Sequence, residues 1–347
     1  MFKKCLTLTL TLMLLFTVAS AAFAEETFAD DAGRSVTIPA SVERFAPSGP
    51  LAQIMLFAIA PERFTNLASE WSSAATPFMG EHMNLPVLGH LYGSGNLNLE
   101  ALAAADPQVI IDIGEPKSGI AEDMDALQAQ LGIPAIHIAA DLFTFSDAYR
   151  KLGALLGETE RAEMLALYCE EILARTAAIM EKVGESRVSV LYCLGDEGLN
   201  VLANGSYPAQ SLDMVCQNLA VVDNPVNKGT GNTVDMEQLL VWDPDMIIFA
   251  PDSVYAAVGT DPLWQDLKAV SSGNYVETPA APLNWMGFPS SVQRYLGMIW
   301  LCSILYPEAC EYDLYAETAR YFDLFYHYEL TQEQFDSLMV HSMPNAK

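Results

Sequence analysis

The chain has 347 residues, of which 51% are hydrophobic and 18% are charged. This length suffices for two ordinary domains with sizeable cores, and the composition excludes wholesale disorder. Acidic side chains number 44 against 17 basic ones, which gives a formal net charge of −27. Because such a field repels phosphate groups, we expect neither nucleic acid nor an anionic membrane surface as a partner.

The first 24 residues have the pattern of a secretory signal peptide. Lys3 and Lys4 precede an apolar stretch over 6–18 that is too short for a comfortable membrane span, and a small-x-small cleavage site ends at Ala24. We expect cleavage after Ala24 and a periplasmic or secreted product that does not insert into the membrane. An uncleaved anchor is the alternative.

Short apolar runs and helical patterns alternate along the rest of the chain. Alternation with continuous apolar strands is typical of mainly parallel sheets that are covered on both faces. In chain order, the patterns predict helices over 51–60 and 122–131, strands over 134–139 and 188–191, a helix over 209–218 and a strand over 246–250.

An internal repeat is the most informative feature. Asn98-Leu-Glu-Ala-Leu runs on to Asp106-Pro-Gln-Val-Ile-Ile, and Asp235-Met-Glu-Gln-Leu runs on to Asp243-Pro-Asp-Met-Ile-Ile. Each copy predicts a short helix with a polar N-cap, a stop near Asp-Pro and then a buried strand. The repeated unit indicates two lobes of similar fold, with chance similarity of two helix–strand junctions as the alternative.

The strongest helix pattern lies between the two copies. Thr159 can cap it, Gly184 can end it, and neither Gly nor Pro interrupts the apolar stripe from Ala162 to Ile179. About 24 residues at about 1.5 Å each give a stiff rod of roughly 36 Å. We predict an α/β fold of two Rossmann-like lobes with a ligand cleft between them: an N-terminal lobe over 25–155, a linking helix over 156–184, and a C-terminal lobe over 185–347.

The C-terminal region contains many aromatic residues between Tyr312 and Tyr328. We expect this segment to pack as a helix on the second lobe. A Thr331-x-x-Gln334 capping box then predicts the start of a last helix.

Five cysteines would remain after export, and an odd number leaves at least one thiol free or linked to another molecule. None forms a C-x-x-C pair, so a structural zinc site has little support. The sequence allows either a Cys302–Cys310 disulfide or buried free thiols. The five are Cys169, Cys193, Cys216, Cys302 and Cys310.

Catalytic signatures are missing from the sequence. There is no GxxxxGK[ST] loop, HExxH, GxSxG elbow or GxGxxG after a strand, and the histidines never lie at i, i+4 spacing. His82 and His90 could share a loop site, although two solvated histidines are the plainer interpretation. These absences favour binding over catalysis, so we expect no enzymatic activity, no metal site and no resident cofactor.

Several segments together resemble the periplasmic binding protein family for iron–siderophore, haem and vitamin B12 uptake. They are the exported start, the opening DAGRSVTIP at 31–39, the repeated Asn-Leu-Glu…Asp-Pro…Ile-Ile unit, and NWMGFPSSVQR at 284–294 with its following helix. The resemblance covers roughly 27–335, and the order of the motifs makes it specific. The chain departs from the family pattern in lacking a lipid-attachment cysteine and in having few arginines for the cleft.

The resemblance implies a monomeric carrier that delivers its ligand to the permease of an ABC importer. In relatives, one glutamate on each lobe meets arginines of the importer, and Glu100 and Glu237 match those positions. Two fixed carboxylates give a two-point register against a basic partner. The alternative is structural, because a carboxylate in the first turn of a helix interacts favourably with the helix dipole.

Ligand contacts are expected on loops at the carboxyl ends of the strands. Aromatic faces suit a flat or greasy chelate, and an arginine pairs with carboxylate or catecholate oxygens. Core packing competes as an explanation for each aromatic residue, and an ordinary salt bridge competes for the arginine. The candidates are Ser48, Trp71 and Tyr92 in the first lobe, and Tyr207, Trp285, Phe288 and Arg294 in the second.

The resulting hypothesis is an exported protein that captures an iron–siderophore or a related metal chelate. Haem or a corrinoid is the alternative ligand. A metal-dependent exported enzyme is the alternative from another class, because two-lobed α/β folds also support such chemistry.

Overall fold

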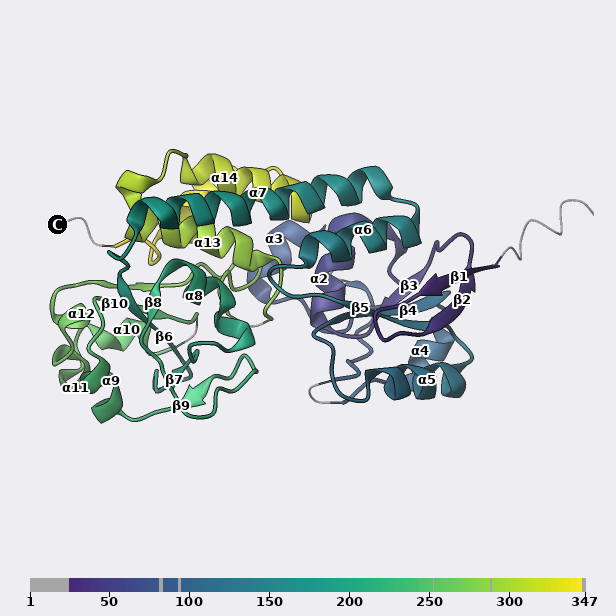
Figure 1. Ribbon diagram of the computed structural model, residues 1–347, viewed down its shortest axis with the longest axis horizontal. Coiled ribbons are helices and arrows are strands. Elements are labelled where there is room, and N and C mark those ends of the chain that lie inside the picture. The colour runs from purple at the N-terminus through teal and green to yellow at the C-terminus, as the bar shows by residue number, and fades with distance from the viewer. Residues whose placement is uncertain (1–24, 81–83, 93–94, 252, 288, 345–347) are drawn as a thin grey trace, which may run out of the picture.

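The computed structural model describes residues 25–80, 84–92, 95–251, 253–287 and 289–344. The predicted signal peptide and Phe288 lie outside the described residues. Two α/β lobes lie end to end, and the helix α7 (Thr159–Val183) runs along both of them (Figure 1). The predicted fold class, two α/β lobes with mainly parallel sheets and one long helix, is confirmed.

The N-terminal lobe is built on a parallel sheet in the order β3-β4-β5. An antiparallel hairpin of β1 and β2 precedes it. All but the last residue of β4 are buried, as expected for a strand covered on both faces. The elements are β1 (Glu25–Ala29), β2 (Ser35–Pro39), β3 (Phe45–Pro47), α2 (Pro50–Ile59), α3 (Thr76–Met79), α4 (Leu99–Ala104), β4 (Val109–Gly114), α5 (Ile120–Leu131), β5 (Ala135–Ala139) and α6 (Phe145–Leu156).

The C-terminal lobe has a six-stranded sheet in the order β11-β10-β6-β7-β9, with β8 also paired to β6. Strands β6, β8, β10 and β11 are parallel, whereas β7 is antiparallel to β6 and β9. The elements are β6 (Ser189–Leu194), β7 (Asn200–Val201), α8 (Gln210–Val215), β8 (Gln217–Asn218), β9 (Asn232–Thr233), α9 (Met236–Trp242), β10 (Met246–Phe249), α10 (Tyr255–Val258), α11 (Pro262–Gln265), α12 (Lys268–Ser271), β11 (Tyr275–Glu277), α13 (Gln293–Leu305), α14 (Leu314–Tyr326) and α15 (Gln332–Met339).

Two local predictions are wrong in detail. The helix expected over 209–218 ends at Val215, because Gln217 and Asn218 pair with β6 as the short strand β8. Thr159 is the first residue of α7 and not its cap; Glu158 holds the N-cap position without a side-chain capping bond. The stop at Gly184, which has a φ of 60°, is as predicted.

The repeat folds twice in the same way. The side chains of Asn98 and Asp235 each accept a hydrogen bond from a backbone N–H three residues on, at 3.0 and 2.8 Å, and so cap α4 and α9. Asp106 and Asp243, each before a proline, both adopt positive φ, at 51° and 38°. The strands β4 and β10 follow, so the predicted helix–stop–strand unit is confirmed in both lobes.

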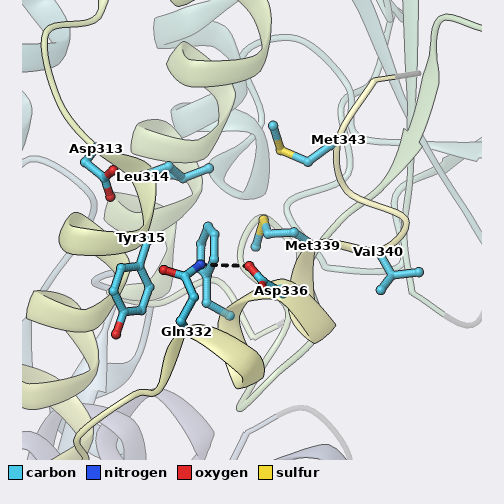
Figure 2. Close-up of a pocket in the computed structure, with 9 residues that line it drawn as sticks. Asp313, Leu314, Tyr315, Gln332, Asp336, Met339, Val340 and Met343 are labelled. Atoms are coloured by element: carbon cyan, nitrogen blue, oxygen red, sulfur yellow. Dashed lines mark hydrogen bonds between the residues drawn. The ribbon is translucent and has the colours of Figure 1, made fainter. Parts of the chain in front are cut away.

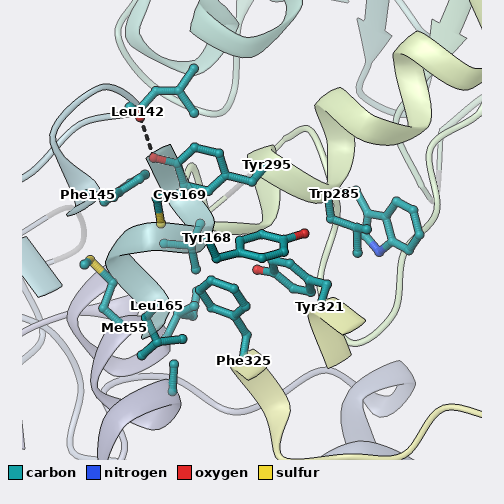
Figure 3. Packing of buried hydrophobic residues seen from close by; sticks show 14 of the residues in the cluster. Met55, Leu142, Phe145, Leu165, Tyr168, Cys169, Trp285, Tyr295, Tyr321 and Phe325 are labelled. Carbon is teal, nitrogen blue, oxygen red and sulfur yellow. Dashed lines mark hydrogen bonds between the residues drawn. The ribbon is translucent and has the colours of Figure 1, made fainter. Parts of the chain in front are cut away.

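Aromatic residues of α14 pack against both lobes. The sequence pattern predicts packing on the second lobe alone, and the contacts with the first lobe correct that expectation. The ring centroids of Phe78 and Phe322 are 5.1 Å apart, and those of Tyr149 and Phe325 are 6.1 Å apart. Figure 3 shows Phe325 and Tyr321 facing Tyr168 of α7 in this shared core. The helix lies along α7 (Figure 1) and thereby reaches α2 of the first lobe. One continuous apolar cluster therefore joins the lobes on the α7 side.

All five described cysteines are free thiols, so a Cys302–Cys310 bridge is not formed in this structure. Four of them are buried and Cys310 is partly exposed. Burial raises the pKa of Cys193 to about 12, which keeps this thiol protonated at neutral pH. None of the helices in the described ranges is long and apolar enough to cross a membrane.

The contact between α6 and α7 makes a specific prediction about stability. A Cβ on Gly153 would overlap the Cβ of Ala162 and lie 3.3 Å from the Glu158 carbonyl oxygen. We expect Gly153→Ala to lower the free energy of unfolding by about 1–3 kcal/mol, because overpacking forces the helices apart. Denaturant unfolding measures this change.

The control is the double variant Gly153→Ala/Ala162→Gly, which moves the methyl group from one helix to the other. A double-mutant cycle should give a favourable coupling energy, since the second change removes the overlap. A coupling energy near zero would contradict the proposed close contact.

Candidate functional site

Hydrogen bonds join the lobes where the strands of the first lobe end. After β5, the Leu142 N–H donates to Oε1 of Gln210 at 3.4 Å, and the Leu142 carbonyl accepts from the Tyr295 hydroxyl at 2.7 Å (Figure 3). The Tyr207 hydroxyl donates to the Ala140 carbonyl at 3.4 Å. We call this region, residues 140–145 against 207–210 and 294–295, the lobe junction.

Arg294 is the central charged group of the lobe junction and is only 1% exposed. Its Nη1 donates to the Tyr207 carbonyl at 2.8 Å and to Oε1 of Gln210 at 3.1 Å. The guanidinium lies over the Tyr207 ring, 4.8 Å from its centroid. Its Nη2 has no hydrogen-bond partner, and no carboxylate forms an ion pair with it, among the residues that the structure describes. The ordinary salt bridge that the sequence suggested as the alternative role of Arg294 is therefore not formed among the described residues.

Carboxylates of the first lobe interact electrostatically with this guanidinium. Burial lowers the pKa of Arg294, and the negative charge of Asp141 works in the opposite direction. Burial raises the pKa of Glu115, whereas Lys117 and Arg294 lower it and Asp141 raises it. Glu115 directly follows β4, and one cation from each lobe, Lys117 and Arg294, lowers its pKa.

Sequence reasoning missed Glu115 and Asp141. Each comes one or two residues after a buried parallel strand, which is where ligand contacts are expected. That signal was available, but among 44 carboxylates it did not distinguish these two.

Ser48, at the end of β3, lies over a buried polar network. Its hydroxyl donates to the Asp112 carboxylate, and the other oxygen of Asp112 is 2.7 Å from Nδ1 of His137. The order differs from that of a Ser-His-Asp triad, because the serine hydroxyl contacts the carboxylate and not the imidazole. The arrangement ties the loop after β3 to buried side chains of β4 and β5.

Tyr92 carries a second cation–aromatic contact, in the first lobe. The ammonium of Lys117 lies 3.7 Å from the centroid of the Tyr92 ring, and the Tyr92 hydroxyl donates to Asp123 at 3.0 Å. Burial raises the pKa of Tyr92, so the phenol stays neutral. The Leu91 N–H donates to the Ser48 carbonyl at 2.8 Å, which places this loop beside the end of β3.

The two tryptophan candidates lie in the core. Trp285 has no exposed surface, and its Nε1 donates to the Ala281 carbonyl at 3.0 Å. Trp71 is buried with its ring 5.5 Å from that of Phe57. The structure thus brings Tyr207 and Arg294 together, and Ser48 next to the Tyr92 loop, but neither tryptophan joins them. Phe288 lies outside the described residues, and ligand contact by any of these seven stays a prediction.

The two glutamates of the repeat are exposed in the first turns of their helices. Helices α4, with Glu100, and α9, with Glu237, lie on the same long side of the molecule, across from α7 (Figure 1).

Two surface hollows lie away from Arg294. One of about 420 Å³ is lined mainly by apolar side chains of α14 and α15 (Figure 2). Another of about 470 Å³ lies in the first lobe between residues 68–70, 87–90 and 96–98, and Glu70, His90 and Asn96 line it. Within the described ranges, no group of three or more His, Cys, Asp or Glu side chains could hold a metal ion.

The raised pKa of Glu115 predicts how stability depends on pH. A carboxyl group whose pKa is higher in the folded state stabilises the fold while protonated, and this contribution is lost as pH rises through the folded-state pKa. We expect Glu115→Gln, which mimics the protonated form, to raise the melting temperature relative to wild type more at pH ~7 than at pH ~4.

Glu185→Gln is the control, since Glu185 is exposed and its replacement changes net charge equally. Thermal unfolding of the three proteins across this pH range measures the effect. Equal shifts for Glu115→Gln at both pH values would be inconsistent with a raised pKa.

Comparison with known proteins identifies the family. A sequence profile of the family described as periplasmic binding protein matches residues 81–282, more than half of the chain. No curated protein matches the chain.

Solved structures share the whole fold. An ABC transporter solute binding protein from Sulfurospirillum deleyianum is 28% identical with a TM-score of 0.82, and the alignment covers 90% of this chain and 98% of that one. A periplasmic solute binding protein from Veillonella parvula is 22% identical with a TM-score of 0.78, covering 92% and 98%. The molybdate periplasmic binding protein MolA from Haemophilus influenzae is 17% identical with a TM-score of 0.70, covering 88% and 99%.

Profile and fold agree with the two-lobed architecture and with the long helix that runs along both lobes. The chain therefore belongs to the periplasmic binding protein family, whose members are non-enzymatic carriers that bind small-molecule ligands and work with the permeases of ABC transporters.

Proposed function

We propose that this protein binds an anionic metal chelate, such as an iron–siderophore, at the lobe junction and delivers it to an ABC importer. It acts as an exported monomer that begins at Glu25 after signal-peptide cleavage. The observation that carries the ligand class is the buried guanidinium of Arg294, whose Nη2 has no partner among the described residues.

A buried cation without a counter-ion is costly, because desolvation is not offset by an ion pair. A carboxylate or catecholate oxygen of a chelate would supply both the missing charge and an acceptor for Nη2. The Tyr207 ring and the Gln210 amide already fix the guanidinium, so little side-chain conformational entropy would be lost when the anion binds.

The charge distribution supports the same ligand class. Most described lysines and arginines form ion pairs with carboxylates. Of the described lysines and arginines that form none, which also include Arg161, Arg187 and Lys228, Lys117 and Arg294 each lie on a tyrosine ring, one in each lobe. In a chain of net charge −27, these two cations near the strand ends favour a ligand with more than one anionic group.

Binding would involve little rearrangement of the lobes. Because α7 and α14 share a continuous core with both lobes, a wide hinge opening would disrupt aromatic packing. Arg294 is covered by Tyr207 and lies 5.9 Å from the Phe145 ring centroid, so a ligand reaches it after a small local displacement of the lobe junction.

The test is a binding titration on purified residues 25–347, followed by tryptophan fluorescence. The panel contains ferric citrate, a ferric tricatecholate, a ferric trihydroxamate, haem, cobalamin and molybdate. We expect the anionic ferric complexes to bind most tightly, and Arg294→Gln to weaken their binding about 10- to 100-fold, since one charge-assisted hydrogen bond contributes about 1.5–3 kcal/mol.

Arg187→Gln is the matched control, because Arg187 is an exposed arginine of the same lobe and its loss changes net charge equally. Thermal unfolding checks that both variants fold. Unchanged affinity in a folded Arg294→Gln variant, or tightest binding of uncharged cobalamin, would disprove the anionic ligand class.

We also propose that Glu100 and Glu237 dock on basic residues of the permease. Both carboxylates are exposed, they occupy equivalent places in the two lobes, and their helices face the same side. A fixed pair of carboxylates gives orientation as well as attraction.

Replacing both glutamates with lysine should reduce uptake at least about 10-fold, because two charge-assisted contacts become repulsive. Uptake of iron-55 supplied as the best-binding ferric complex is measured in cells that lack the wild-type protein. The double variant Glu185→Lys/Glu333→Lys controls for net charge. Unchanged uptake with unchanged ligand affinity would rule out the docking role.

A further inference from the structure

We infer that the outer face of α9 is an asymmetric docking surface, in which Leu240 and Val241 insert into an apolar recess of the permease beside the cation that meets Glu237. The inference rests on the proposed docking of Glu100 and Glu237. It adds an apolar component to that contact and assigns this component to the C-terminal lobe.

The geometry of α9 places the three side chains together. Glu237, Leu240 and Val241 are at positions i, i+3 and i+4, which share one face of a helix. All three are exposed: Leu240 by 37% and Val241 by 78%. Leu239, between them in sequence, is fully buried in the lobe core. The helix therefore points its one core-facing leucine inward and leaves two large apolar side chains in solvent beside a carboxylate.

The equivalent helix of the first lobe has the same pattern with smaller side chains. In α4, Glu100 is followed at i+3 and i+4 by Ala103 and Ala104, and all three are exposed. Leu102 takes the inward position and is buried. Both copies of the repeat thus place a glutamate beside two apolar side chains on one exposed helix face. Of the two helices, only α9 presents enough apolar surface to fill a recess.

The permease is the occupant that these observations favour. Members of the family work with ABC permeases, and α4 and α9 lie on the same side of this molecule (Figure 1). The acidic surface, at a net charge of −27, selects a basic partner, and Asp235 adds a further exposed carboxylate at the start of α9. A partner that offers a cation next to an apolar recess would bury Leu240 and Val241 while it pairs with Glu237.

The neighbouring structure keeps this face rigid. The end of α9 is fixed to α12, because the Lys268 N–H donates to Oδ1 of Asp243 at 3.0 Å. Leu239 and Trp242 also pack in the core of the C-terminal lobe. The exposed side chains are therefore presented by a fixed helix, which lowers the entropic cost of docking.

The experiment uses the full exported protein and its importer. We expect Leu240→Ser/Val241→Ser to weaken binding to the reconstituted permease about 10-fold or more, because burial of the two side chains is lost, and to leave affinity for the ferric complex unchanged. Ala103→Ser/Ala104→Ser is the matched control in α4 and should stay close to wild type. Val340→Ser controls for loss of an exposed valine elsewhere, since Val340 is 67% exposed on the C-terminal segment.

A photo-crosslinking amino acid provides a second readout. Placed at position 241 it should crosslink to the permease, as identified by mass spectrometry, and placed at position 340 it should not. If the Leu240→Ser/Val241→Ser variant binds the permease like wild type while charge reversal of Glu100 and Glu237 abolishes binding, the apolar docking is wrong and the acidic docking stands. If neither variant has an effect, both fail. Equal losses for the α4 and α9 serine variants would overturn the asymmetry.

Discussion

The arrangement of the lobes depends on the apolar core that α7 and α14 share with α2 of the first lobe. Tyr168 of α7 lies 5.3 Å from the Phe325 ring, and Phe325 stacks on Tyr321 at 4.3 Å. Because protein interiors are close-packed, sliding one lobe over the other would break several such contacts at once. The core thereby fixes the positions of loops that come from different lobes, and the lobe junction is largely preformed.

This constraint also limits how the charged side chains at the lobe junction can reorient. A flexible connection would let the Arg294 guanidinium turn to water or find a carboxylate. Here the shared core holds it beneath Tyr207, while Glu115 and Asp141 act on it through space without forming an ion pair. The packing around this cation offsets the cost of leaving it without a counter-ion, and in the proposed binding mode an anionic ligand would recover that cost.

Features set by local interactions could be predicted from the sequence. The caps at Asn98 and Asp235 satisfy backbone groups within the same turn, and the length of α7 follows from an uninterrupted helical pattern. The repeat made the two-lobed architecture visible because each copy encodes its own helix, stop and strand. No distant contact is needed for any of these, so one sequence suffices.

Features set by contacts between distant residues could not be predicted in the same way. Gln217 and Asn218 continue a helical pattern but form a strand because β6 offers a free edge, so pairing overrides local preference. The aromatic residues of α14 show that a helix is buried, but not that it is buried against both lobes. Trp285 and Arg294 occur in one segment, yet the core encloses the first and the lobe junction contains the second.

The internal repeat and the shared core have a joint consequence for release of the ligand. The repeat places a carboxylate on the same side of each lobe, and the core keeps Glu100 and Glu237 at a nearly constant separation. A permease that binds both with a different spacing must strain the protein, and the strain falls where the lobes are joined by few contacts. On the α7 side the lobes share many buried side chains, whereas the lobe junction is held by single hydrogen bonds such as that of Tyr207 to Ala140. In the proposed mechanism, docking energy therefore acts on the contacts around Arg294. The rigidity that limits spontaneous opening thus also transmits the strain of permease docking to the ligand site.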